Sequence, residues 1–429
     1  MARWTEAQVL AAAPDTSSVA AARKLAKPGP WTETGANEIL VWGSCQGSGK
    51  NPYQVSIDLE GPAYRCSCPS RKFPCKHALA LLLLWAGGLV GEGAEAAGFA
   101  QEWADKRATR SEARTVRAEA PADPEAQARR LAERIARMDA GVDDLILWLT
   151  DLVRAGLVTA RTQPYAFWDR AAARLVDAQL PGLADRVREL ATHAAGEAWA
   201  DDLLRHLGRL WLLAQAWRRR DELPAPLAAD LRAAVGWSTQ REQLSDGETR
   251  TDTWQVLGAF RTTDGPLQQQ RTWVRADGGP VGLILETAGP GQALGIPQLA
   301  GARLAGTAAW YPGNAPARLY FPEPPTPVEP ATDAGPAVTV AEARAQVATA
   351  LAGVPWRDRF PVTLAAARFR HDPQAVVDAA GDAFALTADT NLILLLALTG
   401  GHPHDVFGEL EAGRFRPLTL ALDGKTVAL

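Results

Sequence analysis

Hydrophobic residues change their spacing several times along the chain, and each change indicates a different kind of structure. Residues 1–36 carry helix-capping residues and are predicted to form an exposed helical segment. Between residues 37 and 66 short apolar stretches are separated by turn residues. Over residues 53–59 apolar and polar positions alternate strictly, which is typical of a half-buried strand. The apolar run over residues 78–85 then predicts a buried helix, which two glycines end.

The middle of the chain has a helical pattern. Residues 91–122 are rich in alanine, glutamate and arginine, and we expect a partly helical linker there. From residue 123 to residue 245 apolar residues recur at spacings of three and four, which predicts amphipathic helices packed together. Asp123 followed by Pro124 is a typical helix start. These residues are therefore predicted to form an all-helical domain.

The last part of the chain changes to strand-like segments. In residues 246–321 these segments are separated by turn residues, which predicts an antiparallel β domain. The proline-rich stretch 322–339 is expected to be an extended linker. Residues 340–429 begin with a helical pattern and end in short strands, so an α/β C-terminal segment is expected. The predicted fold class is a multidomain α+β protein, with a small N-terminal module over residues 37–90.

Composition and charge narrow the possible functions. A hydrophobic content of 47% with 22% charged residues excludes extensive disorder. The formal net charge of −4 means that any nucleic-acid surface must be local, because proteins that wrap nucleic acid are usually basic. No apolar stretch has the length of a membrane-spanning helix, and no signal-peptide core is evident, so we expect a cytoplasmic location. Arginine outnumbers lysine, which we attribute to a GC-rich bacterial genome.

Four residues with metal-ligand chemistry lie close together in the sequence: Cys66, Cys68, Cys75 and His77. Clustered cysteines in a reducing compartment indicate a metal site rather than disulfides. Three thiolates and one imidazole are ligands that tetrahedral Zn²⁺ prefers, and a complete set of four protein ligands makes the site structural. The alternative is a chance cluster of buried free cysteines. Cys45 is interpreted as a buried strand residue, with a spare ligand as the alternative.

Basic and aromatic residues surround the predicted zinc site. The cations would offset the negative charge of the thiolates and favour their deprotonated form. They could also contact phosphates, while the aromatic rings could stack on unpaired bases. The alternative is a solvated surface. The residues predicted for contact with a partner or with nucleic acid are Lys50, Tyr64, Arg65, Arg71, Lys72, Phe73 and Lys76.

The Cys-x-Cys-x₆-Cys-x-His pattern, between paired strands and a helix, resembles the SWIM zinc finger. The sequence around it, from Trp42 to Tyr53 and from Cys75 to Leu79, resembles the bacterial proteins of that family. The resemblance is specific over residues 37–90. It implies a ββα fold, one structural Zn²⁺, and a role in binding DNA or protein. It also implies candidate partners, a MoxR-type AAA ATPase or a von Willebrand factor A domain protein.

The leading functional hypothesis is an adaptor that uses its zinc module to bind a macromolecule, with a protein partner favoured. The first alternative is a DNA-binding protein that uses the basic residues around the zinc site. The second alternative is an enzyme whose site lies in residues 250–429. No catalytic triad order, paired carboxylates or dinucleotide fingerprint stands out, so neither catalytic residues nor a small-molecule substrate are predicted.

Overall fold

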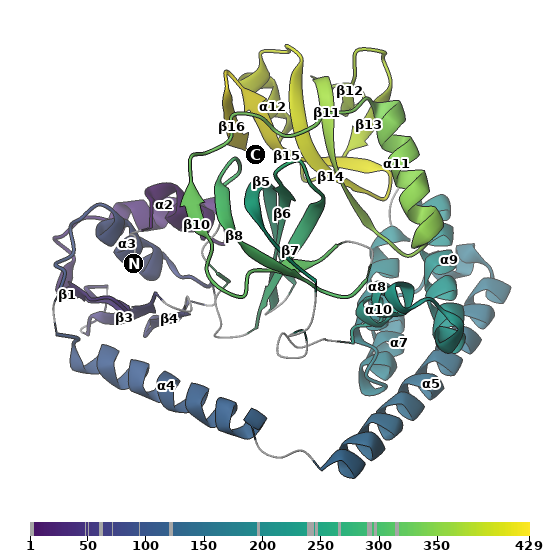
Figure 1. Ribbon diagram of the computed structural model, residues 1–429, viewed down its shortest axis with the longest axis horizontal. Helices are drawn as coiled ribbons and strands as arrows, with labels where there is room; N and C mark the ends of the chain where they lie inside the picture. Colours follow the sequence, from purple (N-terminus) through teal and green to yellow (C-terminus); the bar gives the residue numbers. More distant parts are fainter. Residues whose placement is uncertain are drawn as a thin grey trace.

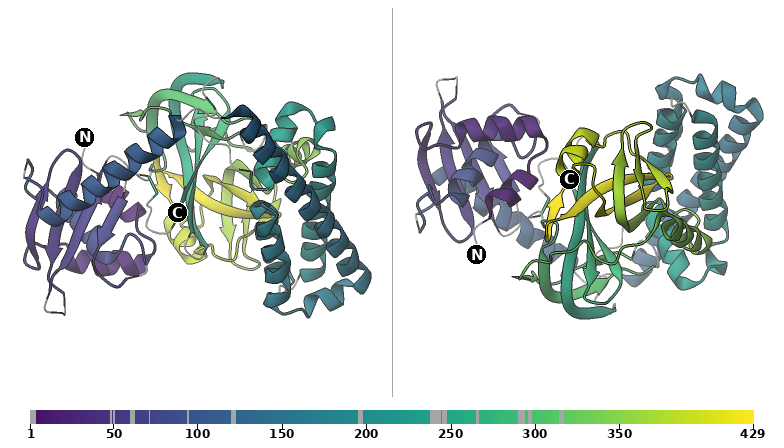
Figure 2. Two further views of the ribbon diagram at one scale, coloured as in Figure 1. Left: turned by 90° about the horizontal axis from the view of Figure 1, so that it is seen from below. Right: turned by 90° about the horizontal axis from the view of Figure 1, so that it is seen from above.

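The computed structural model places four parts along the molecule, with the N-terminal module at one end, a helical bundle at the other, and two β domains between them (Figures 1 and 2). The chain is thus a mixed α+β protein, as its sequence predicts. The structure describes residues 4–429 except 48, 50, 60–62, 71, 94, 120–122, 195–197, 238–243, 245–247, 265–266, 290–293, 296–297 and 314–316. Among the described helices, none combines the length and the apolar character that crossing a membrane requires.

The N-terminal module is a four-stranded antiparallel sheet with helices on both faces. Helix α3 packs on one face and in turn contacts α1 and α2, and α4 covers the other face (Figure 2). Alternation along β2 explains both layers, because Val41 faces the α3 core whereas Leu40 and Trp42 face α4. The elements are α1 (Glu6–Ala11), α2 (Thr16–Leu25), β1 (Trp31–Ala36), β2 (Leu40–Cys45), β3 (Tyr53–Asp58), β4 (Ala63–Cys66), α3 (Lys76–Ala86) and α4 (Gly98–Glu119).

The structure corrects two predicted boundaries in this part and enlarges the expected ββα unit. Residues 1–36 are not a separate helical segment, because β1 pairs with β2 and both preceding helices share the core of α3. Residues 91–122 are not simply a linker, because α4 packs Ala100 and Trp103 against the sheet. Both errors have one cause. Local spacing predicts an element but does not show which distant surface buries its apolar residues.

An all-helical bundle follows. Asp123 caps α5 by accepting hydrogen bonds from the N–H groups of Glu125 and Ala126, with Pro124 at the first helical position. Gly141 lets α5 pass close to the end of α7, since an added Cβ would lie 2.4 Å from the Cβ of Ala178. The elements are α5 (Pro124–Ala155), α6 (Leu157–Arg161), α7 (Tyr165–Asp177), α8 (Pro181–His193), α9 (Trp199–Arg218), η1 (Arg220–Glu222) and α10 (Ala225–Ala234).

The first β domain is an antiparallel sheet of order β10-β8-β5-β6-β7, with β9 paired to β8. Residues 322–339 were predicted to be a linker, but part of this stretch forms β10, which pairs with β8. Short edge strands tolerate proline because only one side of the strand is hydrogen-bonded. The strands are β5 (Thr249–Asp264), β6 (Leu267–Ala276), β7 (Val281–Ala288), β8 (Arg303–Trp310), β9 (Leu319–Tyr320) and β10 (Thr326–Val328).

The C-terminal domain is a second six-stranded sheet with two helices. Its order is β13-β12-β11-β14-β15-β16, and β13 also pairs with β15, so that five strands close into a small barrel. The elements are α11 (Val340–Gly353), β11 (Arg359–Arg370), β12 (Ala375–Val377), β13 (Ala383–Leu386), α12 (Leu392–Thr399), β14 (His404–Glu411), β15 (Arg414–Leu422) and β16 (Lys425–Ala428).

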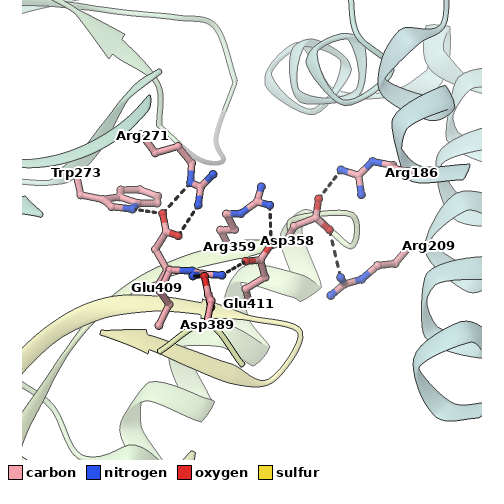
Figure 3. Close-up of polar contacts among 10 residues, drawn as sticks. Arg186, Arg209, Arg271, Trp273, Asp358, Arg359, Asp389, Glu409 and Glu411 are labelled. Atoms are coloured by element: carbon pink, nitrogen blue, oxygen red, sulfur yellow. Dashed lines mark hydrogen bonds and ion pairs between the residues drawn. The ribbon is translucent and has the colours of Figure 1, made fainter. Parts of the chain in front are cut away.

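The two β domains are joined by a buried ion pair. The guanidinium of Arg271 donates from Nε and Nη2 to the carboxylate of Glu409 at 3.0 and 2.9 Å, and the indole of Trp273 donates to the same carboxylate at 2.7 Å (Figure 3). Arg271 and Glu409 are 3% and 0% exposed, so the pair is removed from water. Such a pair stabilises only when its hydrogen bonds are satisfied, as they are here.

Candidate metal centre

Four side chains converge between the end of β4 and the start of α3. Cys66 is the last residue of β4, Cys68 follows in the turn, Cys75 is the N-cap of α3, and His77 lies in the first turn of that helix. One potential ligand atom from each lies within 4.8 Å of the others, and the Sγ of Cys66 is 3.8 Å from the Nδ1 of His77. The sequence motif therefore corresponds to a cluster in space.

Neighbouring groups hold these side chains in place. The Ser67 N–H donates to the carbonyl oxygen of Gln54, and the Gln54 N–H donates to the Ser67 hydroxyl, both at 3.0 Å. These bonds fix the turn between the first two cysteines. The imidazole of His77 is 4% exposed, and the Tyr53 ring lies 4.9 Å from it. The sequence placed Tyr53 on a strand but gave no sign of this contact, which depends on how β3 packs against α3.

The close spacing of the thiols lowers the pKa of one of them and raises the pKa of another. A hydrogen bond from Cys66 lowers the pKa of Cys75 to about 4, although burial acts in the opposite direction. His77 and the N–H of Ala78 add to this stabilisation of the thiolate, as expected at a helix N-terminus. The same hydrogen bond, followed by burial, raises the pKa of Cys66. A divalent cation would allow all three thiolates to coexist.

The cluster fits zinc. Ligand atoms about 2.0–2.3 Å from one tetrahedral Zn²⁺ lie less than about 4 Å apart, which is close to the spacing of these four. Three sulfur ligands and one nitrogen ligand form a closed set with no position left for a reacting water molecule. When bound, zinc would cross-link the end of β4 to the start of α3.

Comparison with known families agrees with this geometry. Residues 53–86 match the SWIM zinc finger, and residues 133–235 match the SWIM-associated four-helix bundle domain. No curated protein and no solved structure matches the chain. The chain therefore carries a SWIM zinc finger together with the helical domain associated with it. Its cofactor is one structural Zn²⁺, with Cys66, Cys68, Cys75 and His77 as ligands.

The predicted basic and aromatic surface around the zinc site is not one patch. Tyr64 is 5% exposed and packs edge-to-face on Phe73, so its ring is not available for stacking on a base. Arg65 is exposed, but successive strand residues point to opposite faces. It therefore points away from its neighbour Cys66, to the face that α4 covers, where it lies near Glu102. These residues are close together in the sequence and were predicted to form one patch, but the alternation along the strand places them on opposite faces of the sheet.

The remaining predicted contact residues have different surroundings. Lys72 binds Asp15 at the start of α2 (2.7 Å), and the carbonyl oxygen of Phe73 accepts a hydrogen bond from Gln268 (2.8 Å). Lys76 is exposed at the start of α3. Two of the predicted residues, Lys50 and Arg71, lie outside the described residues. Within the part of the chain that the structure describes, Lys76 is thus the one predicted cation that is exposed, lies beside the ligands and makes no ion pair.

Cys45 lies apart from the metal cluster. It is fully buried in β2, where burial raises the pKa of its thiol, and its Sγ is 3.9 Å from the carbonyl oxygen of Gln46. The cluster of potential ligands among the described residues does not include it.

The module is attached to the first β domain close to the site. Arg261 of β5 donates to the carbonyl oxygen of Ala12 at 2.8 Å, and Gln268 of β6 binds the loop that carries Cys75. No local pattern in the sequence indicated this attachment, because the contacting residues are about 200 or more positions apart.

Proposed function

We propose that the protein is a non-catalytic adaptor whose SWIM zinc module binds a protein partner while the bundle and the β domains form a scaffold behind it. The observation that carries the proposal is the charge arrangement around the zinc site. Among the predicted cations that the structure describes, Lys72 is paired with Asp15 and Arg65 faces the opposite side of the sheet, which leaves Lys76 as the one unpaired cation beside the ligands. The described residues therefore contribute only a weak positive field at the site.

A weak field favours a protein partner over DNA. Binding to DNA depends on several unpaired cations that replace condensed counterions along the phosphate backbone. Other cations of the module are also paired, since Arg107 binds Asp58 at 3.1 Å and Lys106 binds Glu102 at 2.5 Å. Protein interfaces tolerate such mixed, paired charges at their rim. Zinc in this arrangement supports the shape of the surface and takes no part in a reaction.

The scaffold role rests on the contacts between domains. The buried pair of Arg271 and Glu409 joins the two β domains, and Asp358 binds Arg186 and Arg209 of the bundle. A partner held by the module is thereby linked to the remaining domains. The first partners to test are the two that the family resemblance implies, a MoxR-type AAA ATPase and a von Willebrand factor A domain protein.

Two binding experiments on the zinc-loaded full chain test the proposal. In the first, labelled single- and double-stranded DNA is titrated across a salt series and followed by fluorescence anisotropy. In the second, each candidate partner is titrated by calorimetry. Lys76→Glu changes an exposed charge beside the ligands, and Lys24→Glu on α2 is the matched control. We expect partner binding that Lys76→Glu weakens and Lys24→Glu does not, with little salt dependence.

DNA binding that weakens as salt increases, and that is weaker in the Lys76→Glu variant, would show that the partner is DNA rather than a protein. Turnover of a substrate by the zinc-loaded chain would overturn the non-catalytic assignment.

A further inference from the structure

A cavity of about 540 Å³ lies where the helical bundle, the first β domain and the C-terminal domain meet. Its walls come from α8, α9 and α10, from β6 and β7, and from the segment just before β11. Figure 3 shows the charged side chains that gather at this junction. The volume is in the range of small-molecule sites, about 300–1,000 Å³. No single domain could form this cavity, and the proposed adaptor function does not use it.

Three arginines of the lining are only partly neutralised by carboxylates. Arg186 and Arg209 share the single carboxylate of Asp358, at 2.5 and 3.2 Å, which leaves a local excess of positive charge. The Nε of Arg357 donates to the carbonyl oxygen of Arg359 at 3.1 Å, and within the described chain Arg357 makes no ion pair. Burial lowers the pKa of Arg209 and of Arg357, because their cations have lost part of their hydration.

Several hydrogen-bonding atoms of the lining are buried without a partner among the described residues. They are the Nε1 of Trp356, the Nε2 of His206 and the Nε of Arg359. Trp356 is 6% exposed, so its indole N–H has little access to water. Buried donors are rarely left unpaired, because each one costs the free energy of desolvation. The Nε1 of Trp356 and the Nε of Arg359 are donors, and a ligand in the cavity that brings acceptors would satisfy them.

The acidic residues of the lining do not fully offset the positive charge of its arginines. The lining has five acidic residues, which are Asp185, Glu189, Asp230, Asp358 and Glu411, and six arginines. Arg271, one of the six, is already paired with Glu409, so the positive excess is local, at Arg186, Arg209 and Arg357. Burial raises the pKa of Glu189, which favours its neutral form. Glu411 binds Arg359 at 2.5 Å and also lies 3.8 Å from Arg416. An anion therefore complements the part of the cavity near Arg186, Arg209 and Arg357 better than a cation would.

We propose that this cavity binds a phosphorylated small molecule. A phosphate group offers three acceptor oxygens in different directions. Donors from two separate elements can meet them: Arg357 and Trp356 before β11, and His206, in the tautomer protonated on Nε2, on α9. Arginine is well suited to phosphate because its donors form a rigid fork. Leu283 and Leu285 provide an apolar wall for the rest of the ligand.

Calorimetric titration of the zinc-loaded full chain with phenyl phosphate tests the proposal, with inorganic phosphate and benzoate as comparison ligands. We expect phenyl phosphate to bind more tightly than inorganic phosphate, which lacks the apolar group, and more tightly than benzoate, which offers fewer acceptors. Arg357→Gln should weaken phenyl phosphate by about tenfold or more, because hydrogen bonds to charged groups are the stronger ones. Trp356→Phe should weaken it by about three- to tenfold.

Trp217→Phe is the matched control. Trp217 is also buried in the bundle, but its indole donates to Asp139 at 2.8 Å and does not line the cavity. This substitution should lower the melting temperature and leave affinity unchanged. Trp356→Phe should weaken binding and leave the melting temperature unchanged, because it removes a donor that has no partner in the protein. Absence of binding by phenyl phosphate at millimolar concentration, or equal affinity in the wild type and both cavity variants, would overturn the site. Equal or tighter binding of benzoate would overturn the assignment to phosphate.

Discussion

The zinc centre and the junction between the three downstream domains both concentrate polar groups in buried positions, but they are assembled differently. The four zinc ligands lie within one short segment, between residues 66 and 77. At the junction, Arg271 and Glu409 are 138 positions apart, and Arg186 and Asp358 are 172 apart. The local site depends on a metal ion to join its ligands, whereas the junction depends on paired charges held together by domain packing. The two regions should therefore fail in different ways.

The largest expected effect is loss of zinc. Cys75→Ser removes one ligand, and a structural zinc site contributes about 10–16 kcal/mol of binding free energy in comparable small modules. We expect the variant to lose its zinc and the N-terminal module, from α1 to α4, to unfold, while the helical bundle remains folded. Metal analysis and hydrogen exchange would show both results. Cys45→Ser is the control and should retain one zinc per chain. Full zinc content in Cys75→Ser would contradict the ligand assignment.

Breaking the buried pair should give the next largest effect. Glu409→Ala leaves the buried guanidinium of Arg271 without its carboxylate, which costs about 3–5 kcal/mol. Replacing both partners by apolar residues, in Arg271→Met/Glu409→Leu, should recover most of this loss. Chemical denaturation measures both variants, and zinc content should stay unchanged in each. A double variant that is as unstable as Glu409→Ala would show that the pair stabilises the junction beyond its packing.

The same pair predicts a dependence on pH. Burial alone would raise the pKa of Glu409, but its hydrogen bonds to Arg271 and Trp273 and the charge of Arg271 outweigh burial and lower it. A carboxylate whose folded-state pKa is lowered stabilises the protein above its unfolded-state pKa, and this contribution is lost as pH falls. The wild type should thus lose stability below about pH 4.5 more steeply than Arg271→Met/Glu409→Leu. Parallel stability curves for the two proteins would count against this.

Asp358 provides a smaller and more specific test. Its carboxylate is shared by Arg186 and Arg209 and is 25% exposed, so Asp358→Asn should destabilise the protein by about 1–3 kcal/mol. Because the substitution also removes a negative charge from the cavity lining, phenyl phosphate should bind more tightly to this variant. Denaturation and calorimetry on the same sample separate the two effects. Weaker binding would mean that Asp358 positions its arginines for the ligand.

The smallest effect is expected at the surface of the module. Lys72 and Asp15 are 55% and 37% exposed, and exposed ion pairs contribute only about 0.2–1 kcal/mol. Lys72→Ala should therefore change stability by less than about 1 kcal/mol and leave zinc content unchanged. Repeating the denaturation at high salt, which screens this pair, should reduce the difference further. A loss of zinc would show that the contact between α2 and the ligand loop holds the site together.

Sequence spacing predicted the elements better than it predicted their partners. The capping role of Asp123, a strand over β3 and the apolar α3 are local features, and the structure contains each of them. The prediction that this strand is half-buried is wrong, because Ser56 is 1% exposed on the face that α4 covers. The pairing of β1 with β2 and of β10 with β8 adds two strands whose own sequences are weak strand signals. These strands are stable because the neighbouring strand supplies hydrogen bonds and the core covers one face.

The role of the arginines was also beyond what the sequence alone could show. Its abundance over lysine suggested only a nucleotide bias, yet arginines form the buried or half-buried ion pairs at the junction, including those of Arg186, Arg271 and Arg359. A rigid, bidentate guanidinium suits such pairs better than an ammonium group does. Composition could not show this, because the use of a charge depends on which carboxylate the fold brings near it.

The zinc ligands were determined by the sequence itself, because Cys-x-Cys and Cys-x-His bring their side chains together through one turn and the start of one helix. Tertiary structure decided what surrounds that site. It buried Tyr64, turned Arg65 to the opposite face and paired Lys72 with Asp15. It also created the arginine-lined cavity from three domains. Short-range geometry follows from the order of residues, whereas exposure, charge pairing and cavities depend on contacts between segments far apart in the chain.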